Sequence, residues 1–291
     1  MRLGYNTNGF AHHRLEDAIE ILAGIGYRSV ALTLDYHALN PRDDNFLRQR
    51  RRVGELLSRC RLACVIETGA RFLLDARHKH SPTLLDPLPS RRALRREFLR
   101  NAIELADEFG AEAVSFWSGA APDSGGRDVA ESRLVDECRR LLELAERRHV
   151  RLAFEPEPGM LVETMAQFEE LHGRIGHPLF GLTLDAGHVH CLQDGDIAAH
   201  VHRWRDRLFN VHVEDMRRGI HEHLPFGEGD MDYAAVIAAL QGVAYPGGVH
   251  IELSRHSHDA VATAQRAFEA LSHLFPADAR AGQSAPESRD N

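Results

Sequence analysis

Carboxylate and imidazole side chains occur at the ends of several short apolar runs in this chain. Glu155, Asp185, His212 and Glu252 each end, or lie near the end of, one such run. If these runs are neighbouring parallel strands, their carboxyl ends lie roughly 5 Å apart at one edge of a sheet. Several carboxylates buried together are costly unless cations neutralise them. We therefore expect these four side chains to converge on one divalent metal ion. The alternative is that each acid makes a salt bridge or caps a helix.

The donor types indicate which metal such a site would bind. Three carboxylates and one imidazole make an oxygen-rich set that favours Mn²⁺, with Mg²⁺, Co²⁺ or Zn²⁺ as alternatives. A structural zinc site would be expected to include thiolates. Of the four cysteines, only Cys191 is close to one of these run ends, and it lies downstream of the sixth run.

Eight β-rich runs predict the elements that position these residues. Most are apolar at both odd and even positions, as expected of strands buried on both faces of a parallel sheet. The runs cover residues 3–6, 29–34, 63–67, 113–117, 151–155, 181–185, 209–213 and 249–253. Amphipathic stretches with helical spacing lie between them. This strict alternation predicts an α/β fold, a (β/α)₈ TIM barrel with an eight-stranded parallel sheet and its functional groups at the carboxyl ends of the strands.

The barrel is expected to occupy residues 1–275 as a single domain. After Phe275 the chain consists of Pro, Ala, Gly, Ser and charged residues, which predicts a disordered tail over 276–291. A long unpatterned segment, about residues 68–89, follows the third strand. It contains Arg71 and the His-Lys-His group at 78–80, which could contact an anionic substrate group, although a solvent-exposed loop is the favoured interpretation.

The composition argues against several other classes of protein. The 291 residues carry a formal net charge of −8, so net charge supplies no basic surface for nucleic acid. Lys79 is the one lysine among 35 basic residues, which leaves no Walker-type lysine. No apolar run is long enough to span a membrane, no signal-peptide pattern is visible, and four scattered cysteines make no disulfide scaffold. We expect a cytoplasmic protein that binds neither membranes nor nucleic acid.

Five short motifs resemble those of a known superfamily. They read Phe-Glu-Pro at 154–156, Leu-Asp-Ala-Gly-His at 184–188, Asn-Val-His-Val-Glu-Asp at 210–215, Pro-Phe-Gly-Glu-Gly-Asp-Met-Asp at 225–232 and His-Ile-Glu at 250–252. In this order and spacing they resemble the xylose isomerase-like TIM-barrel superfamily over about residues 1–275. That superfamily contains sugar and sugar phosphate isomerases and epimerases, inosose and dehydroshikimate dehydratases, and endonuclease IV-type AP endonucleases.

The resemblance implies roles for individual residues. By position, the four metal ligands of the family fall on Glu155, Asp185, His212 and Glu252. In the epimerase branch the first and the last of these are also catalytic, because they exchange the substrate proton from opposite faces.

Further positions are expected to bind substrate. His188 falls where the family has a substrate-binding or second-metal histidine. Arg217 lies near a substrate-contacting arginine of the family, although Arg218 is an equally good register. The remaining expected substrate-binding residues follow or end the third, fourth and fifth strands: Glu67, Trp117 and Glu157.

A second metal site is a further interpretation of the pattern. His221 and His223, before the Gly-Glu-Gly at 227–229, resemble the Asp-x-His pair of the endonuclease branch and could bind another ion with His188. That branch also uses histidines at the ends of the third and fourth strands, where this chain has Glu67 and Trp117, so a full trinuclear site is not expected. Alternatively, His221 and His223 are polar loop residues that contact substrate or water.

The implied chemistry is proton abstraction next to the carbonyl of a sugar or sugar-like polyol ketone. A metal would stabilise the developing enediolate while Glu155 and Glu252 move the proton. We therefore expect a metal-dependent isomerase or epimerase with a carbohydrate-like substrate. The alternatives are a dehydratase of a cyclic keto-polyol, an endonuclease IV-like phosphodiester hydrolase, and a barrel that only binds a metabolite. Barrels of this type often pair, so a homo-oligomer is compatible with the resemblance.

Overall fold

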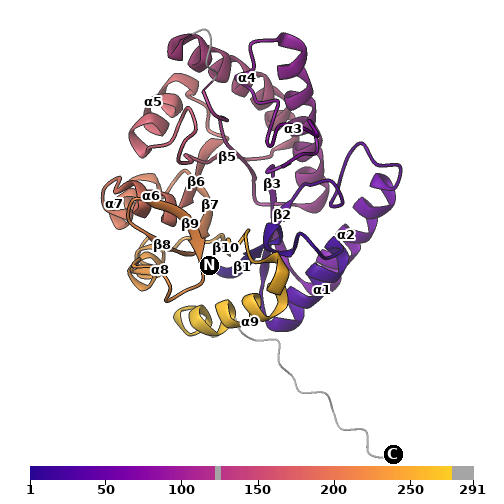
Figure 1. The fold of residues 1–291 in the computed structure, drawn as a ribbon. Helices are drawn as coiled ribbons and strands as arrows, with labels where there is room; N and C mark the ends of the chain where they lie inside the picture. The colour runs from indigo at the N-terminus through magenta and orange to yellow at the C-terminus, as the bar shows by residue number, and fades with distance from the viewer. Residues whose placement is uncertain (122–125, 277–291) are drawn as a thin grey trace, which may run out of the picture.

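Eight parallel strands close into a barrel in the computed structural model, which describes residues 1–121 and 126–276. Around the barrel the order is β1, β10, β7, β6, β5, β4, β3 and β2, and Figure 1 shows helices surrounding it. The barrel strands are β1 (Arg2–Asn6), β2 (Ser29–Thr33), β3 (Ala63–Glu67), β4 (Val114–Phe116), β5 (Leu152–Phe154), β6 (Phe180–Asp185), β7 (Leu208–Val213) and β10 (Gly248–Ile251). The predicted (β/α)₈ fold is confirmed.

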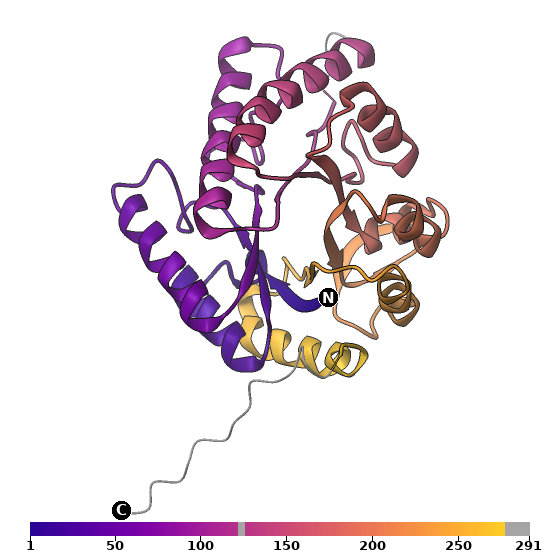
Figure 2. The ribbon, with the colours of Figure 1, turned by 180° about the vertical axis from the view of Figure 1, so that it is seen from behind.

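Helices pack around the outside of the sheet, as the view from behind also shows (Figure 2). They are α1 (Leu15–Ile25), α2 (Phe46–Cys60), α3 (Pro89–Phe109), α4 (Arg127–Arg148), α5 (Met165–Ile175), α6 (Ala186–Leu192), α7 (Ile197–Trp204), α8 (Tyr233–Gly242) and α9 (Ala260–Leu271). Three short 3₁₀ segments are η1 (Thr7–Phe10), η2 (Ser257–Asp259) and η3 (Ser272–Leu274). The apolar faces of the helices bury residues such as Leu22, Leu99 and Leu141 in one continuous core.

Several strands end earlier than the apolar runs predict. β4 ends at Phe116, β5 at Phe154 and β10 at Ile251. Trp117, Glu155 and Glu252 therefore come directly after their strands, where the chain leaves the parallel ladder for the loops at the mouth of the barrel. Their side chains remain at the carboxyl ends of the strands, where functional groups of barrels of this kind are found.

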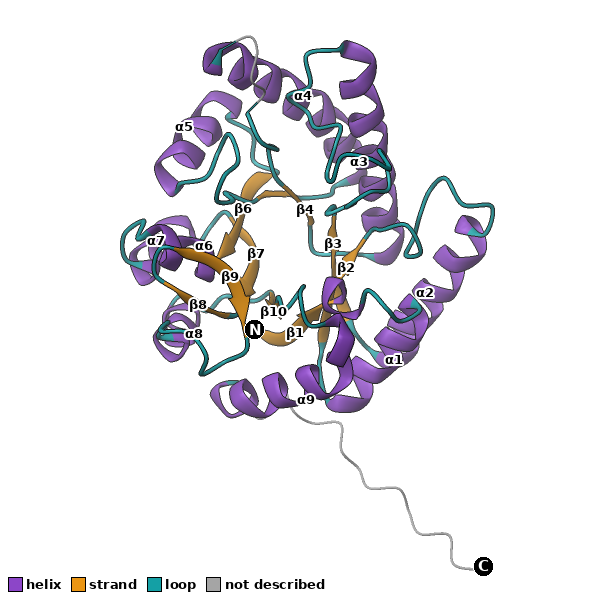
Figure 3. Ribbon diagram, in the orientation of Figure 1, coloured by secondary structure: helices purple, strands orange, loops and turns teal. Residues whose placement is uncertain are grey.

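An antiparallel hairpin, which the sequence did not predict, follows β7. It consists of β8 (Asp215–Arg217) and β9 (Ile220–Leu224), drawn beside the barrel in Figure 3. The buried carboxylate of Asp215 holds the segment after it, because it accepts hydrogen bonds from the backbone N–H groups of Gly227, Gly229 and Met231. The interpretation of His221 and His223 as loop residues is thus wrong about their element, because both lie on β9.

The described residues limit two of the expectations. From residue 277 onward, the segment expected to be a disordered tail lies outside the described part of the chain. Among the residues that are described, no helix is long and apolar enough to cross a membrane.

Candidate active site

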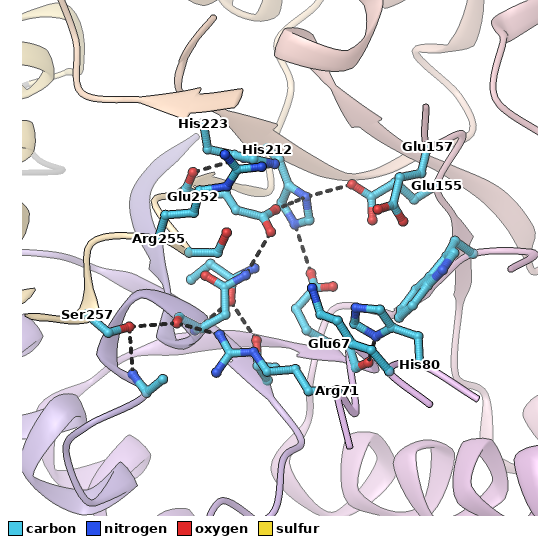
Figure 4. A pocket seen from close by; sticks show the side chains of 18 of the residues that line it. Glu67, Arg71, His80, Glu155, Glu157, His212, His223, Glu252, Arg255 and Ser257 are labelled. Carbon is cyan, nitrogen blue, oxygen red and sulfur yellow. Dashed lines mark hydrogen bonds and ion pairs between the residues drawn. The ribbon is translucent and has the colours of Figure 1, made fainter. Parts of the chain in front are cut away.

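A cavity of about 420 Å³ opens at the carboxyl ends of the barrel strands. Its lining includes Glu67, Glu155, Glu157, His212 and Glu252, which come from four different strands or the residues directly after them. Figure 4 shows these side chains pointing toward a common space, with His212 between Glu252 and Glu155. The cavity therefore lies where the sequence predicts the functional groups.

The four expected metal ligands come together at this cavity. Nδ1 of His212 lies 3.0 Å from Oε1 of Glu155, 2.9 Å from Oε2 of Glu252 and 3.9 Å from Oδ2 of Asp185. One ligand atom from each of the four residues lies within 4.8 Å of the corresponding atom of every other. A set with these separations can surround one ion.

The hydrogen bonding of Asp185 is a test of whether the four residues fit a cation. Asp185 caps helix α6, and its Oδ1 accepts a hydrogen bond from the backbone N–H of His188 at 2.8 Å. Its Oδ2 is buried and has no hydrogen-bond partner. A buried carboxylate oxygen without a partner carries a large desolvation cost. A divalent ion at this position would satisfy it, and the oxygen-rich donor set is one that such ions accept.

Burial and the charge of His212 affect the pKa values of Glu155 and Glu252 differently. Burial lowers the pKa of His212, but the carboxylates of Glu67, Glu155 and Glu252 outweigh burial and hold that pKa well above its ordinary value. Burial also raises the pKa of Glu155 well above its usual range. Burial acts in the same direction on the pKa of Glu252, yet the charge and hydrogen bond of His212 hold that pKa well below its usual range. In the metal-free protein the pKa values of these two carboxyl groups are therefore displaced in opposite directions.

Glu67 lies behind His212 at the end of β3. Its Oε1 is 2.9 Å from Nε2 of His212 and accepts a hydrogen bond from the side-chain amide of Asn210, also at 2.9 Å. Oδ1 of Asn210 is 2.9 Å from Nδ1 of His250, whose Nε2 is 2.8 Å from the hydroxyl of Ser29. A polar chain therefore runs through the interior of the barrel and ends on His212.

Glu157 and Trp117 also line the cavity, as expected of substrate-binding residues. Burial raises the pKa of Glu157 to about 8. The Trp117 ring contacts the guanidinium of Arg95, 5.0 Å from its centroid, and packs in a T-shaped pair with the ring of His80, with centroids 5.3 Å apart. One wall of the cavity is therefore a fixed aromatic surface.

Three histidines form a second cluster beside the first. His188, His221 and His223 each offer a ligand atom within 4.8 Å of the others. Nδ1 of His188 lies 3.1 Å from the carbonyl oxygen of Pro156, to which it can only donate, so its Nε2 is left as an acceptor. That Nε2 is 3.1 Å from Nε2 of His221. The structure thus brings together the three residues that the sequence suggests for a second ion.

The structure does not bring the expected arginine to the cavity. Arg217 is exposed, and its guanidinium donates a hydrogen bond to the carbonyl oxygen of Glu228 at 2.8 Å. Neither Arg217 nor Arg218 lines the cavity, because the hairpin turns both outward. The cations that do line it are Arg71, Lys79 and Arg255.

The loop after β3 is solvent-exposed over residues 76–79, as expected, but some of its residues also line the cavity. Arg71, Lys79 and His80 all line the cavity. The physical reason is that the loop is tied back to the barrel, with the guanidinium of Arg71 at 3.2 Å from Asp35 and donating to the carbonyl oxygen of Asn8. Part of this loop is therefore a wall of the site.

Glu214 is a buried site residue that sequence reasoning did not select. Both of its carboxylate oxygens are buried without a hydrogen-bond partner, and burial raises its pKa well above the usual range. It forms a cluster with Asp185 and His223. The alternation of side chains along a strand could have predicted Glu214 as a site residue. It follows His212 by two positions, and such residues face the same side of a strand.

Comparisons with known proteins agree with this fold. The family model for xylose isomerase-like TIM barrels matches residues 19–274. The L-ribulose-5-phosphate 3-epimerase UlaE of Salmonella paratyphi C (strain RKS4594) is 26% identical over 194 residues, covering 66% of this chain and 68% of that protein. The fold is shared with a D-allulose 3-epimerase from Methylomonas sp., at a TM-score of 0.75 and 19% identity over 94% of this chain and 98% of that one. It is also shared with the IOLI protein with a bound zinc atom, at a TM-score of 0.72 and 17% identity over 94% and 99% of the two chains.

The family model covers most of the barrel, from α1 to the last 3₁₀ segment. The resemblance carried by the five motifs is thereby confirmed. This chain belongs to the xylose isomerase-like TIM-barrel family.

Proposed function

We propose that this enzyme is a divalent-metal-dependent sugar isomerase or epimerase that removes a proton next to the carbonyl of a sugar-like ketone. The observation that carries the proposal is the convergence of Glu155, Asp185, His212 and Glu252, with one buried oxygen of Asp185 left without a partner. The relatives support a sugar-like substrate, because they include epimerases of L-ribulose 5-phosphate and of D-allulose.

The placement of the two glutamates favours epimerisation. Glu155 follows β5 and Glu252 follows β10, and two strands, β6 and β7, lie between these in the barrel. The two carboxyl groups thus approach the centre from different sides. One removes the proton from one face of the substrate carbon, and the other returns a proton to the opposite face. A bound divalent ion would stabilise the negative charge that develops on the substrate oxygens.

For the metal, the three carboxylates and one imidazole favour Mn²⁺ over Zn²⁺. The histidine cluster of His188, His221 and His223 has two possible roles, which are to contact substrate hydroxyls or to hold a second ion. Metal analysis of the loaded protein separates these roles, because one ion per chain supports the first and two support the second.

The cysteines bear on the compartment. Cys60, Cys64, Cys138 and Cys191 form no disulfide, and all but Cys60 are buried. Unpaired buried thiols fit a reducing compartment, and we propose the cytoplasm.

The test is turnover of a panel of ketoses and ketose phosphates in deuterated water. We expect epimerisation with one solvent deuteron incorporated at the inverted carbon, loss of turnover after treatment with a chelator, and recovery on addition of Mn²⁺. Turnover that survives complete metal removal, or inversion without deuterium incorporation, would contradict the proposal.

A further inference from the structure

Lys79 lies among the residues that line the cavity. The chain contains one lysine, Lys79, while every other residue among its 35 lysines and arginines is arginine. Lys79 is also exposed to solvent.

Two contacts fix the loop that carries Lys79 at the cavity that also contains Glu155, His212 and Glu252. The side chain of Thr68 donates a hydrogen bond to the carbonyl oxygen of Ser115 at 2.8 Å, which fixes the start of the loop to β4. At the other side of Lys79, Nδ1 of His80 lies 2.6 Å from the carbonyl oxygen of Gly69. Burial lowers the pKa of His80 to about 4, so the ring is neutral and serves as an anchor rather than a charge.

The backbone at this anchor is in an unusual conformation. His80 has a φ of 62°, in the left-handed region that residues other than glycine rarely adopt. Such strain persists only where surrounding contacts impose it, and here the contacts are the Gly69 hydrogen bond and the T-shaped packing against the Trp117 ring. The backbone next to Lys79 is therefore fixed at the cavity wall, while the lysine side chain itself is exposed.

The positive charges of the cavity differ in how well they are paired. Arg71 is held by Asp35 and by the carbonyl oxygen of Asn8. Arg255 faces Glu222 at 3.6 Å, an exposed pair of the kind that contributes little. Within residues 1–121 and 126–276, no hydrogen bond or ion pair engages the Lys79 ammonium.

Two of the arginines lie away from Glu155 and Glu157, whereas burial raises the pKa of Glu157 and the charge of Lys79 acts to lower it. Figure 4 shows Arg71 and Arg255 apart from Glu155 and Glu157. An ion bound among the carboxylates would offset much of the negative charge at that end. The cations that line the other parts of the cavity would then face the substrate with their charge available.

We infer that Lys79 binds an oxyanion group of the substrate, a phosphate ester or a carboxylate, while the metal cluster holds the carbonyl end. This inference rests on the proposed function for the site and narrows its substrate class to anionic sugars. Both kinds of cation bind phosphate and carboxylate groups; a guanidinium does so through two parallel hydrogen bonds, and a lysine ammonium does so as a compact point charge.

The experiment compares a ketopentose 5-phosphate, the same ketopentose without phosphate, and a five-carbon aldonate. Each is titrated into the full-length, metal-loaded protein, and turnover is measured for the two ketoses. The variants are Lys79→Met and, as a matched control, Arg77→Met, which removes one positive charge from the same loop at an exposed residue outside the cavity lining. Titration with inorganic phosphate provides a binding measurement that does not depend on turnover.

We expect the anionic ligand to bind at least about tenfold more tightly than the neutral ketose, and Lys79→Met to remove most of this preference while Arg77→Met keeps it. A preference for the phosphate over the aldonate identifies the phosphate ester, and the reverse identifies the carboxylate. Equal affinity for neutral and anionic ligands, or a preference unchanged by Lys79→Met, would overturn the inference. Absence of turnover with every sugar, together with Lys79-dependent phosphate binding, would instead reject only the proposed reaction.

Discussion

Oε1 of Glu67 lies 2.9 Å from Nε2 of His212, on the edge of the ring opposite to the acidic cluster. Nδ1 of the same ring faces Glu155 and Glu252. A carboxylate at Nε2 fixes a proton there, and this leaves Nδ1 free to bind an ion. Glu67 was expected to contact substrate and does line the cavity, and from its contact with His212 we propose that it also positions this ring.

Replacing Glu67 should therefore weaken metal binding. We predict that Glu67→Ala lowers the affinity for Mn²⁺ by about 10- to 100-fold, because such outer carboxylates orient histidine ligands and raise their basicity. Competition with a chromophoric chelator measures this affinity. Glu67→Gln keeps the shape of the side chain and a hydrogen bond, so its loss of Mn²⁺ affinity should be smaller than that of Glu67→Ala. Glu97→Gln, on the exposed face of α3, is the control. Unchanged affinity in Glu67→Ala would show that Glu67 has another role.

The two glutamates beside His212 should be separable by isotope exchange. We predict that Glu155→Gln and Glu252→Gln each lower epimerisation by at least about 100-fold, because each removes one of the two proton-transfer groups. Each variant should still exchange the substrate proton with deuterated water from one epimer, and the active epimer should differ between them. Circular dichroism and metal content verify that both variants remain folded and loaded. Loss of exchange from the same epimer in both would argue against two bases on opposite faces.

Metal affinity should rise with pH. In the metal-free protein, burial lowers the pKa of His212, but Glu67, Glu155 and Glu252 raise it well above its ordinary value, so an incoming ion must displace a proton. The apparent Kd should then fall by about tenfold per pH unit below that pKa. Calorimetry in buffers of different ionisation enthalpy detects the released proton. A Kd that is independent of pH, with no proton released, would contradict this.

The raised pKa of His212 also makes the free energy of unfolding of the metal-free protein depend on pH. The His212 contribution is fully present below the ordinary histidine value of about 6.5 and is lost as the pH rises through the higher folded value.

Gly187 should not tolerate a side chain. A Cβ at this position in α6 would lie 1.9 Å from Oε1 of Glu214 and 2.7 Å from Cε of Met216, and both neighbours are buried. We predict that Gly187→Ala lowers the free energy of unfolding by about 1–3 kcal/mol, as overpacking does elsewhere. Gly173→Ala in α5 is the matched control, because a Cβ there meets nothing within 4 Å. It should raise stability by about 0.5–1 kcal/mol. Urea denaturation of both variants tests the contrast.

Much of the barrel was predictable because each strand is buried on both faces and so reads as a compact apolar run. The same logic located Glu155, Asp185, His212 and Glu252, because polar side chains at the ends of such runs have few other places to go in a parallel barrel. The expectation that they meet depended only on strand order, which a closed barrel fixes.

Other features depend on contacts that one-dimensional patterns do not contain. The β8–β9 hairpin consists of short segments rich in charged residues, so no apolar run in the sequence predicts it. Hydrogen bonds from backbone N–H groups to the buried carboxylate of Asp215 hold the segment that follows it. That hairpin turns Arg217 outward, away from the position expected by resemblance. The loop that carries Lys79 is held toward the cavity by contacts of other residues. Arg71 pairs with Asp35, and His80 contacts the carbonyl oxygen of Gly69.

The central claim is that Glu155, Asp185, His212 and Glu252 bind one divalent cation together. Anomalous diffraction from crystals of the protein loaded with Mn²⁺ tests it most directly. We predict a manganese peak enclosed by these four side chains, and its loss in Asp185→Asn. A peak elsewhere with these four side chains unliganded, or no peak at saturating Mn²⁺, would contradict the claim.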